Sequence, residues 1–398
     1  MTEALPDAGR PSVPPAAEPA GAAESTPPPG RGRLPSLTGL RFAAAFLVFG
    51  FHLQIAHLFP ARSEGDHVLS LLFGHGAIGV SFFFILSGFV LTWSAGPRDP
   101  VRRVWRNRAA KIFPNHLVTA LAALAAVAAG AGAAAGAAGG PGAASPEVVV
   151  PNLLLVQSWS PNPDVYFGLN TVSWSLSCEA FFYLLFPFLL RGLARLDRRA
   201  LWPAAIVLTA VVWCLPLATA GWSEATAYWF LYVLPATRLA EFCLGMALAR
   251  IVASGQWFRC PAWAAGLLLV GAYASIGYLP VRLGYVAVTV VPLALLIPAL
   301  ASADLGGRRT LWATRWAVLL GEVSFAFYMV HQLVIRFAVK ALHVPAAEAP
   351  GWSVPVVIAV QFALLAAALT AAALLWRIVE RPLNNRLRSA PARRVPAI

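Results

Sequence analysis

The stretch LTGLRFAAAFLVFGFHL, residues 37–53, decides the fold class of this chain. It is an apolar run that nevertheless carries two ionisable residues, Arg41 and His52. Ionisable side chains at membrane depth are costly and usually mark a functional site. At about 100° and 1.5 Å per helical residue, His52 returns to within about 20° of the face that Arg41 occupies, about 16 Å further along the axis.

This spacing predicts one helix that holds a fixed cation near a membrane surface and a titratable imidazole near mid-bilayer, both facing one cavity. The alternative is structural: the Arg41 side chain extends to the surface, and His52 packs against a neighbouring helix. The spacing alone leaves both interpretations open.

The composition places the whole chain in the membrane class. Of its 398 residues, 59% are hydrophobic and 12% charged, and the mean hydropathy is +0.69. Soluble domains carry roughly 25% charged residues. The net charge of +13 could indicate nucleic acid binding, but the basic clusters alternate with the apolar segments, so we expect no nucleic-acid partner.

Ten segments are long enough to cross a bilayer, which takes about 20 apolar residues each. They predict an all-α, polytopic helical bundle in the cell membrane, in contact with lipid. If the N-terminus is cytoplasmic, most arginines and lysines fall on the inside, which follows the positive-inside rule with both termini cytoplasmic. The predicted spans are residues 40–60, 74–94, 112–136, 173–192, 201–220, 226–249, 261–280, 283–302, 316–338 and 354–377.

The chain divides into one membrane domain, residues 34–388, and two tails. Residues 1–33, rich in Pro, Ala, Gly and Ser, predict a disordered cytoplasmic tail, and residues 389–398 a short one. The basic stretch 98–111 predicts an interfacial helix, or simple attraction to anionic lipid. The long outside connection 138–172 could be a lid over a site or a tolerated insertion.

Several chemistries are not expected. The four cysteines have no metal-ligand spacing, so we predict neither a disulfide framework nor a metal site. The chain has no phosphate-binding or dinucleotide-binding glycine loop. A membrane ATPase is therefore not expected, and no bound cofactor is predicted.

The fourth span places a carboxylate inside the membrane. Ser175, Glu179 and Tyr183 follow one another at four-residue steps and should share a helix face. Glu179 could accept a proton, orient a histidine or bind a substrate hydroxyl, or it could be held by a structural partner. The cost of a lipid-facing carboxylate favours a role in a site.

Two further polar pairs lie within spans at three-residue spacing. Arg238 and Glu241 can pair within their own helix and fix its packing, or belong to a site. Tyr328 and His331 allow the same two interpretations. In the second span, Ser87 beside a glycine favours close helix packing over nucleophilic catalysis.

Four basic residues are expected at the cytoplasmic ends of their spans: Arg41, Arg108, Lys111 and His116. Together they could form an anion pocket for phosphate groups. The alternative is that these residues only follow the positive-inside rule and bind no ligand.

Six segments, in order, resemble motifs of the integral-membrane acyltransferase-3 family. The resemblance runs from about residue 34 to residue 388. The segments are LTGLRFAAAFLVFGFH with its Arg-x10-His motif, GVSFFFILSGFVL, SWSLSCEAFFYLLFP with Trp174-Ser-Leu-x-x-Glu-x-x-x-Tyr, PATRLAEFCLG, SFAFYMVHQL and VERPL.

The resemblance implies O-acyl transfer from acyl-CoA, as donor substrate, to a hydroxyl of a sugar, polysaccharide or macrolide-type acceptor. It implies that His52 is catalytic, as general base or transient acyl carrier, that Arg41 helps position the donor and that Glu179 is a site carboxylate. We count as candidate substrate-binding residues Arg41, Arg108, Lys111, Trp174, Arg238, Tyr328 and His331.

One position departs from the family pattern. Many relatives have arginine before the Ile-x-Pro of the third helix, where this chain has Lys111. Lysine still neutralises phosphate but lacks the bidentate guanidinium fork. A specific phosphate contact at this position is therefore less well supported.

A proton-coupled transporter is the alternative function. Buried Arg, Glu and His in a ten-span bundle would suit an exporter. The chain shows neither an internal repeat nor paired broken helices, so the acyltransferase is the favoured prediction.

Overall fold

The computed structural model describes residues 32–96, 99–128, 144–344 and 349–387 of the chain. The predicted tails, 1–33 and 389–398, lie outside these ranges except for residues 32 and 33. Across the described ranges the secondary structure is helical and contains no strand, which confirms the predicted all-α fold.

The bounds of the helices follow the chain order. They are α1 (Pro35–Gln54), α2 (Glu64–Phe73), α3 (Gly79–Ser94), α4 (Val101–Ala126), α6 (Pro146–Leu153), α7 (Pro163–Tyr166), α8 (Trp174–Ala194), α9 (Leu201–Ala218), α10 (Glu224–Tyr228), α11 (Pro235–Ala253), α12 (Ala262–Ser275), α13 (Val281–Gly284), α14 (Ala287–Leu305), α15 (Arg315–Ala341), α16 (Val354–Leu375) and α17 (Arg381–Leu387).

Within the described residues, nine helical segments are long and apolar enough to cross a membrane. A shorter apolar helix, Ala262–Tyr278, occupies the seventh predicted span. Each of the ten predicted segments therefore contains a helix within the described residues, but one of these helices falls short of the length that a crossing needs. The protein is a multi-pass membrane protein.

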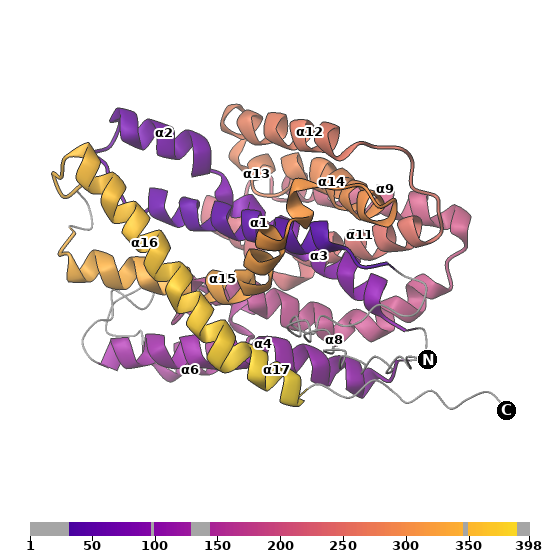
Figure 1. Ribbon diagram of the computed structural model, residues 1–398, viewed down its shortest axis with the longest axis horizontal. Coiled ribbons are helices and arrows are strands. Elements are labelled where there is room, and N and C mark those ends of the chain that lie inside the picture. Colours follow the sequence, from indigo (N-terminus) through magenta and orange to yellow (C-terminus); the bar gives the residue numbers. More distant parts are fainter. Residues whose placement is uncertain (1–31, 97–98, 129–143, 345–348, 388–398) are drawn as a thin grey trace, which may run out of the picture.

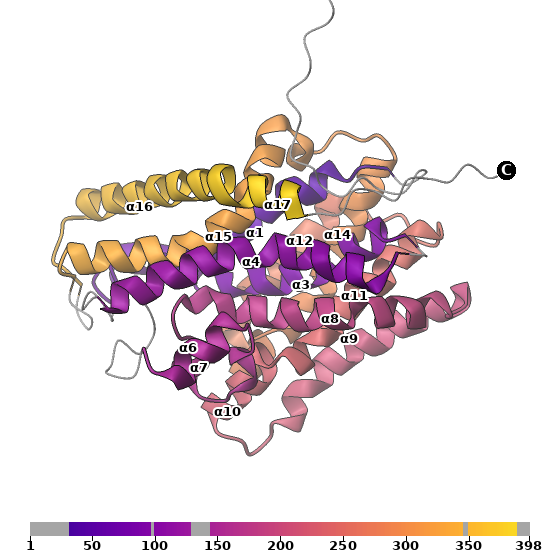
Figure 2. The same cartoon turned by 90° about the horizontal axis from the view of Figure 1, so that it is seen from below.

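Two helix pairs form the centre of the bundle, α1 with α15 and α3 with α11. Figure 1 shows α16 crossing the bundle obliquely, with α2 and α12 at its edge. In Figure 2, α16 and α17 lie on one face, α8 and α9 lie towards the other, and α1, α4 and α15 lie between them. The short helices α6, α7 and α10 gather at one end.

Glycines allow α3 and α11 to pack closely. A Cβ atom at Gly88 would collide with the carbonyl oxygen of Phe242, and one at Gly245 with that of Ile85. The two helices therefore approach backbone to backbone, as small residues permit. This confirms the prediction that the small residues of the second span serve close packing.

The first helix begins and ends earlier than the predicted span of residues 40–60. Pro35 occupies the first turn, where its fixed φ suits a helix, and the Ser36 N–H donates to Asp304 of α14 over 2.9 Å. The helix ends before His57, whose φ is 50°. His52 therefore lies two residues from the C-terminal end of α1.

The third crossing also begins earlier than predicted. Residues 101–111 form the first turns of α4, directly after Pro100, so the predicted basic helix is continuous with the third crossing. The predicted span began only at residue 112 because a hydropathy profile does not detect helical turns rich in basic residues. The end of the predicted span 112–136 lies beyond Ala126, partly outside the described residues.

The described part of the connection 138–172 is held by buried side-chain amides. Asn152 Nδ2 donates to the carbonyl oxygens of Val148 and Val165, both over 2.8 Å. Asn170 Nδ2 donates to the carbonyl oxygen of Met329 on α15, over 2.9 Å. These bonds satisfy the buried backbone and fasten the connection to the bundle.

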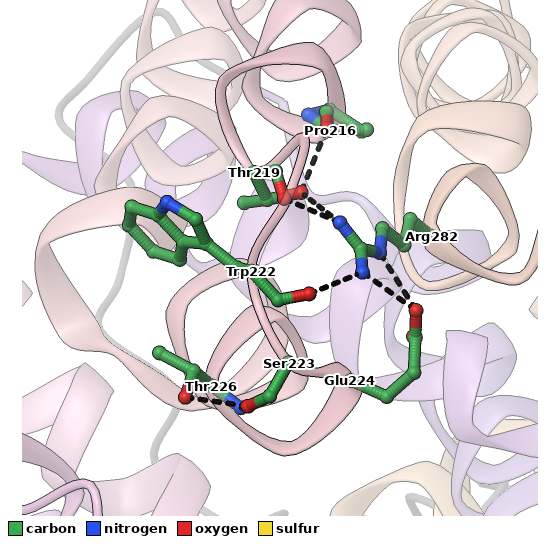
Figure 3. Close-up of polar contacts among 7 residues, drawn as sticks. All are labelled: Pro216, Thr219, Trp222, Ser223, Glu224, Thr226 and Arg282. Atoms are coloured by element: carbon green, nitrogen blue, oxygen red, sulfur yellow. Dashed lines mark hydrogen bonds and ion pairs between the residues drawn. The ribbon is translucent and has the colours of Figure 1, made fainter.

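Arg282 of α13 holds the turn between α9 and α10 (Figure 3). Its guanidinium donates to the carbonyl oxygens of Thr219 and Trp222, the latter over 2.8 Å, and forms an ion pair of 2.6 Å with Glu224. One arginine thus satisfies carbonyl oxygens left free where α9 ends.

Candidate functional site

A cavity of about 750 Å³ lies between α1, α3, α4, α8, α15 and the segment that ends in α17. Its volume is within the range of small-molecule and cofactor sites. Exposed Arg33, just before α1, and exposed Asn385 of α17 both line it. The cavity therefore opens at the end of the bundle where α1 begins and α17 ends.

Three of the four basic residues expected to form an anion pocket line this cavity: Arg41, Arg108 and Lys111. His116 does not, and its inclusion was wrong. It is fully buried, and its Nε2 lies 3.0 Å from the carbonyl oxygen of Asn152. Because α4 begins at Val101, His116 lies about four turns into the helix rather than at its basic end.

These three cations differ in their partners. Arg41 has no hydrogen-bond or ion-pair partner among the residues that the structure describes, and Arg108 lies over the Tyr183 ring, 5.9 Å from its centroid. Lys111 Nζ forms an ion pair of 2.5 Å with Glu380, whose other carboxylate oxygen accepts from Asn115 over 2.7 Å. Lys111 is thus already neutralised, whereas Arg41 is available to a ligand.

The stripe on α8 brings a carboxylate into the same cavity. Ser175, Glu179 and Tyr183 all line it, which confirms that they share a face. The Tyr183 hydroxyl donates to Glu179 Oε2 over 2.8 Å and lies 2.9 Å from Ser87 Oγ. Because this donation uses the only hydroxyl hydrogen of Tyr183, Ser87 is the donor in the second bond. Glu179 is also within electrostatic reach of Arg41.

The two histidines from α1 and α15 form a pair. Nε2 of His331 lies 3.0 Å from Nδ1 of His52. His52 Nδ1 is also 2.9 Å from the carbonyl oxygen of Val48, and His331 Nδ1 is 3.2 Å from that of Phe327. His331 is fully buried, whereas His52 is half-buried.

The cavity and the histidine pair are neighbours, but they are separate. Phe83 and Tyr328 line the cavity, and neither His52 nor His331 does. The Tyr328 ring lies 5.8 Å from both the Phe83 and the His331 rings, and its hydroxyl is 2.8 Å from Ser175 Oγ. The expectation that Arg41 and His52 face one cavity is therefore corrected: Arg41 lines the cavity and His52 does not.

Arg238 lies in the core between α3 and α11. It is 1% exposed, and its Nη2 donates to Ser81 over 3.0 Å. Its Nε is 3.0 Å from a carboxylate oxygen of Glu241, and its Cζ lies 5.0 Å from the ring centroids of both Phe84 and Tyr232. These contacts favour the structural interpretation of the Arg238–Glu241 pair over substrate binding.

Trp174 is likewise buried behind the cavity wall. Its ring lies 4.9 Å from that of Tyr232 and 6.5 Å from that of Phe84, which itself lines the cavity. Trp174 therefore supports the wall without reaching the cavity.

Sequence reasoning missed three functional candidates, Phe83, Ser87 and Glu380. Glu380 could have been found, because a carboxylate directly after an apolar segment needs a partner. Phe83 lies in a run of three phenylalanines, and the sequence does not tell which of them faces the cavity. The small side chain of Ser87, beside a glycine, indicated only close helix packing, whereas in the structure its hydroxyl bonds to that of Tyr183.

Comparisons with known proteins agree on one family. The profile of the family described as "Acyltransferase domain", acyltransferase 3, matches residues 34–377. The chain is similar to acyltransferase MdmB of Streptomyces mycarofaciens, with 42% identity over 367 residues, 89% of this chain and 92% of that protein. It is also similar to exopolysaccharide production protein ExoZ of Rhizobium meliloti (strain 1021), with 28% identity over 347 residues, 85% and 97% of the two chains. No solved structure matches the chain significantly.

Proposed function

Because the chain belongs to the acyltransferase-3 family of membrane acyltransferases, we propose that it transfers an acyl group from acyl-CoA to a hydroxyl of a sugar-bearing acceptor. The observation that carries this proposal is the basic cavity whose inner wall, Tyr328, contacts the His331–His52 pair. Acyl transfer needs a place for a charged donor next to a base that can take a hydroxyl proton.

The donor occupies the cavity of about 750 Å³. Guanidinium groups bind phosphate in a bidentate manner, so Arg41 and Arg108 hold the phosphates of CoA. The apolar lining from α3 receives the pantetheine arm, and the thioester lies towards Tyr328. The positive-inside pattern predicts that the cavity opens to the cytoplasm, where acyl-CoA is found, with the protein in the cell membrane.

The partners of the two histidines support one protonation pattern. Carbonyl oxygens only accept hydrogen bonds, so His331 Nδ1 donates to Phe327 and, in the neutral ring, its Nε2 is left as an acceptor. The single Nδ1–H of His52 is then shared between the carbonyl oxygen of Val48 and Nε2 of His331. Nε2 of neutral His52 keeps its lone pair, which is what a general base requires.

In the direct route, His52 Nε2 takes the proton of the acceptor hydroxyl as its oxygen attacks the thioester carbonyl. The C–S bond breaks, and the thiolate of CoA leaves with the proton from His52. In the second route, His52 Nε2 itself attacks the thioester carbonyl, the C–S bond breaks and CoA leaves as the thiolate. The acceptor oxygen then attacks the acyl-imidazolium, the N–C bond breaks to restore neutral His52, and the hydroxyl proton passes to the thiolate. Both routes need the Tyr328 ring to move aside, because it lines the cavity and contacts the ring of His331, the partner of His52.

Acceptors with sugar hydroxyls are the class that we propose. The name of one relative refers to exopolysaccharide production, which supports a polysaccharide acceptor. The resemblance of the motifs to macrolide-acylating family members supports a macrolide. Family membership favours acyl transfer over the alternative of a proton-coupled transporter.

The test is acyl transfer by the purified protein in detergent. A panel of acyl-CoAs is offered with simple sugars and a sugar-bearing macrolide, and both CoA release and mass gain of the acceptor are measured. We expect transfer by the wild type, its loss in His52→Ala, and its retention in the control His67→Ala, because His67 is exposed on α2.

Turnover retained in His52→Ala would overturn the role of His52. Acyl label on His52 in the absence of acceptor would select the second route. If the folded protein released CoA from no donor, and proteoliposomes took up the acceptor without acyl-CoA, transport would replace acyl transfer.

A further inference from the structure

The face of α15 that lines the cavity continues beyond it. Val318, Phe325 and Tyr328 all line the cavity. At about 100° per residue, Gln332 and Arg336, seven and eleven residues after Phe325, lie within about 20° of its direction. Beyond Tyr328, on the side away from the cavity mouth, this face of α15 therefore carries two polar residues that do not line the cavity.

Both polar residues carry atoms that lack a partner. Gln332 is 5% exposed, and its Oε1 is buried without a hydrogen bond from any residue that the structure describes. Nη1 of Arg336 is also buried without a hydrogen bond to any described residue. No ion pair joins Arg336 to a described carboxylate. Buried polar groups are usually satisfied, and these two unpartnered atoms, one acceptor and one donor, lie on the same face of one helix.

The position of this pair relates it to the histidines. Gln332 directly follows His331, whose Nε2 contacts His52, and Arg336 lies one helical turn beyond Gln332 on α15. His52 lies two residues from the end of α1 that is opposite the cavity mouth. Gln332 and Arg336 are therefore beside the histidine pair, on the side opposite the donor cavity.

We propose that Gln332 and Arg336 form the binding site for the acceptor, and that they bind hydroxyl groups of a neutral polyol such as a sugar. An alcohol both donates and accepts. The Gln332 carbonyl oxygen accepts from a hydroxyl, while Arg336 Nη1 donates to a hydroxyl oxygen. An anion would suit Arg336 but would be repelled by the unpartnered Gln332 oxygen.

This inference rests on the proposed acyl transfer and adds the end of the bundle from which each substrate approaches. The donor approaches from the end where α1 begins, and the acceptor approaches from the opposite end. His52 lies between them, with Tyr328 as the partition. The acylated product then leaves on the side from which the acceptor came.

The first experiment separates acceptor binding from donor binding. At saturating acyl-CoA, the KM is measured for the sugar or macrolide that gains acyl mass in the panel. We expect Arg336→Gln and Gln332→Leu to raise the acceptor KM at least tenfold and to leave the donor KM within twofold. Lys340→Gln, which removes an exposed charge one turn further along α15, should change neither.

An unchanged acceptor KM in both variants, or a rise in donor KM instead, would overturn the proposal. A fall in kcat alone, with both KM values kept, would indicate a structural role and would also overturn it. If the wild type transferred no acyl group, the proposed function itself would have failed, and the second experiment would judge the site independently.

The second experiment tests the side of access without any turnover. In a background with the four cysteines replaced by alanine, Arg336→Cys and Ser87→Cys are labelled with a charged, membrane-impermeant methanethiosulfonate in sealed vesicles of known orientation. We expect Ser87→Cys, in the donor cavity, to react from one side and Arg336→Cys from the other. Labelling from the same side, or no labelling of Arg336→Cys, would overturn a separate acceptor site.

Discussion

Nε2 of His331 lies 3.0 Å from Nδ1 of His52, so residues 279 positions apart in sequence share one hydrogen bond between α15 and α1. This bond sets the ring orientation of the half-buried His52. It also makes the fully buried His331 a positioning residue, because the partner of its own Nδ1 is a backbone carbonyl oxygen.

Replacing His331 should misplace His52 without removing it. We expect His331→Ala to lower kcat about a hundredfold, the loss that a misplacement of about 1 Å can cause, with the donor KM unchanged. His331→Gln should recover part of the rate, because its side-chain oxygen can accept from His52 Nδ1. The rates are measured by CoA release, and equal rates for the two variants would exclude the positioning role.

Removing either of two cations that line the cavity should weaken donor binding. We expect Arg41→Ala and Arg108→Ala each to raise the donor KM by about tenfold or more, the loss of one charge-assisted hydrogen bond. Arg102→Ala is the matched control, because Arg102 is exposed on the same helix as Arg108 and does not line the cavity. An equal effect in the control would mean that general surface charge, not the cavity, attracts the donor.

Freeing Lys111 should strengthen donor binding. Glu380→Gln removes the negative partner of the Lys111 ammonium while its amide can still bond to Asn115. We expect the donor KM to fall about threefold at low ionic strength, as for one partly exposed ion pair, and to return to the wild-type value at high salt. A KM that rises would show that Glu380 holds the cavity open and does not compete with the donor.

Adding a methyl group between α3 and α11 should destabilise the fold. In Gly88→Ala and Gly245→Ala, the new Cβ atoms meet backbone carbonyl oxygens, which cannot move aside as side chains can. We expect each variant to lose about 1–3 kcal/mol of unfolding free energy, seen as a lower Tm in detergent. Gly266→Ala on α12, where the added Cβ meets nothing, is the control.

Much of the architecture could be predicted because a bilayer leaves a spanning chain few choices. Apolar length alone located ten helical segments, although the basic first turns of α4 and the early start of α1 at Pro35 were missed. The helical repeat correctly placed Ser175, Glu179 and Tyr183 on one face. It could not tell that His116 points to Asn152, away from the basic end.

By itself, the sequence determined the all-α membrane class, the family and the shared faces within single helices, because each depends on local hydropathy, motif order or the helical period. Only the tertiary structure decided which faces meet. It joined His52 to His331 and Lys111 to Glu380, placed Tyr328 between cavity and histidines, and buried Arg238 in the core. Such pairings depend on how helices pack across long sequence separations, and no local pattern encodes that packing.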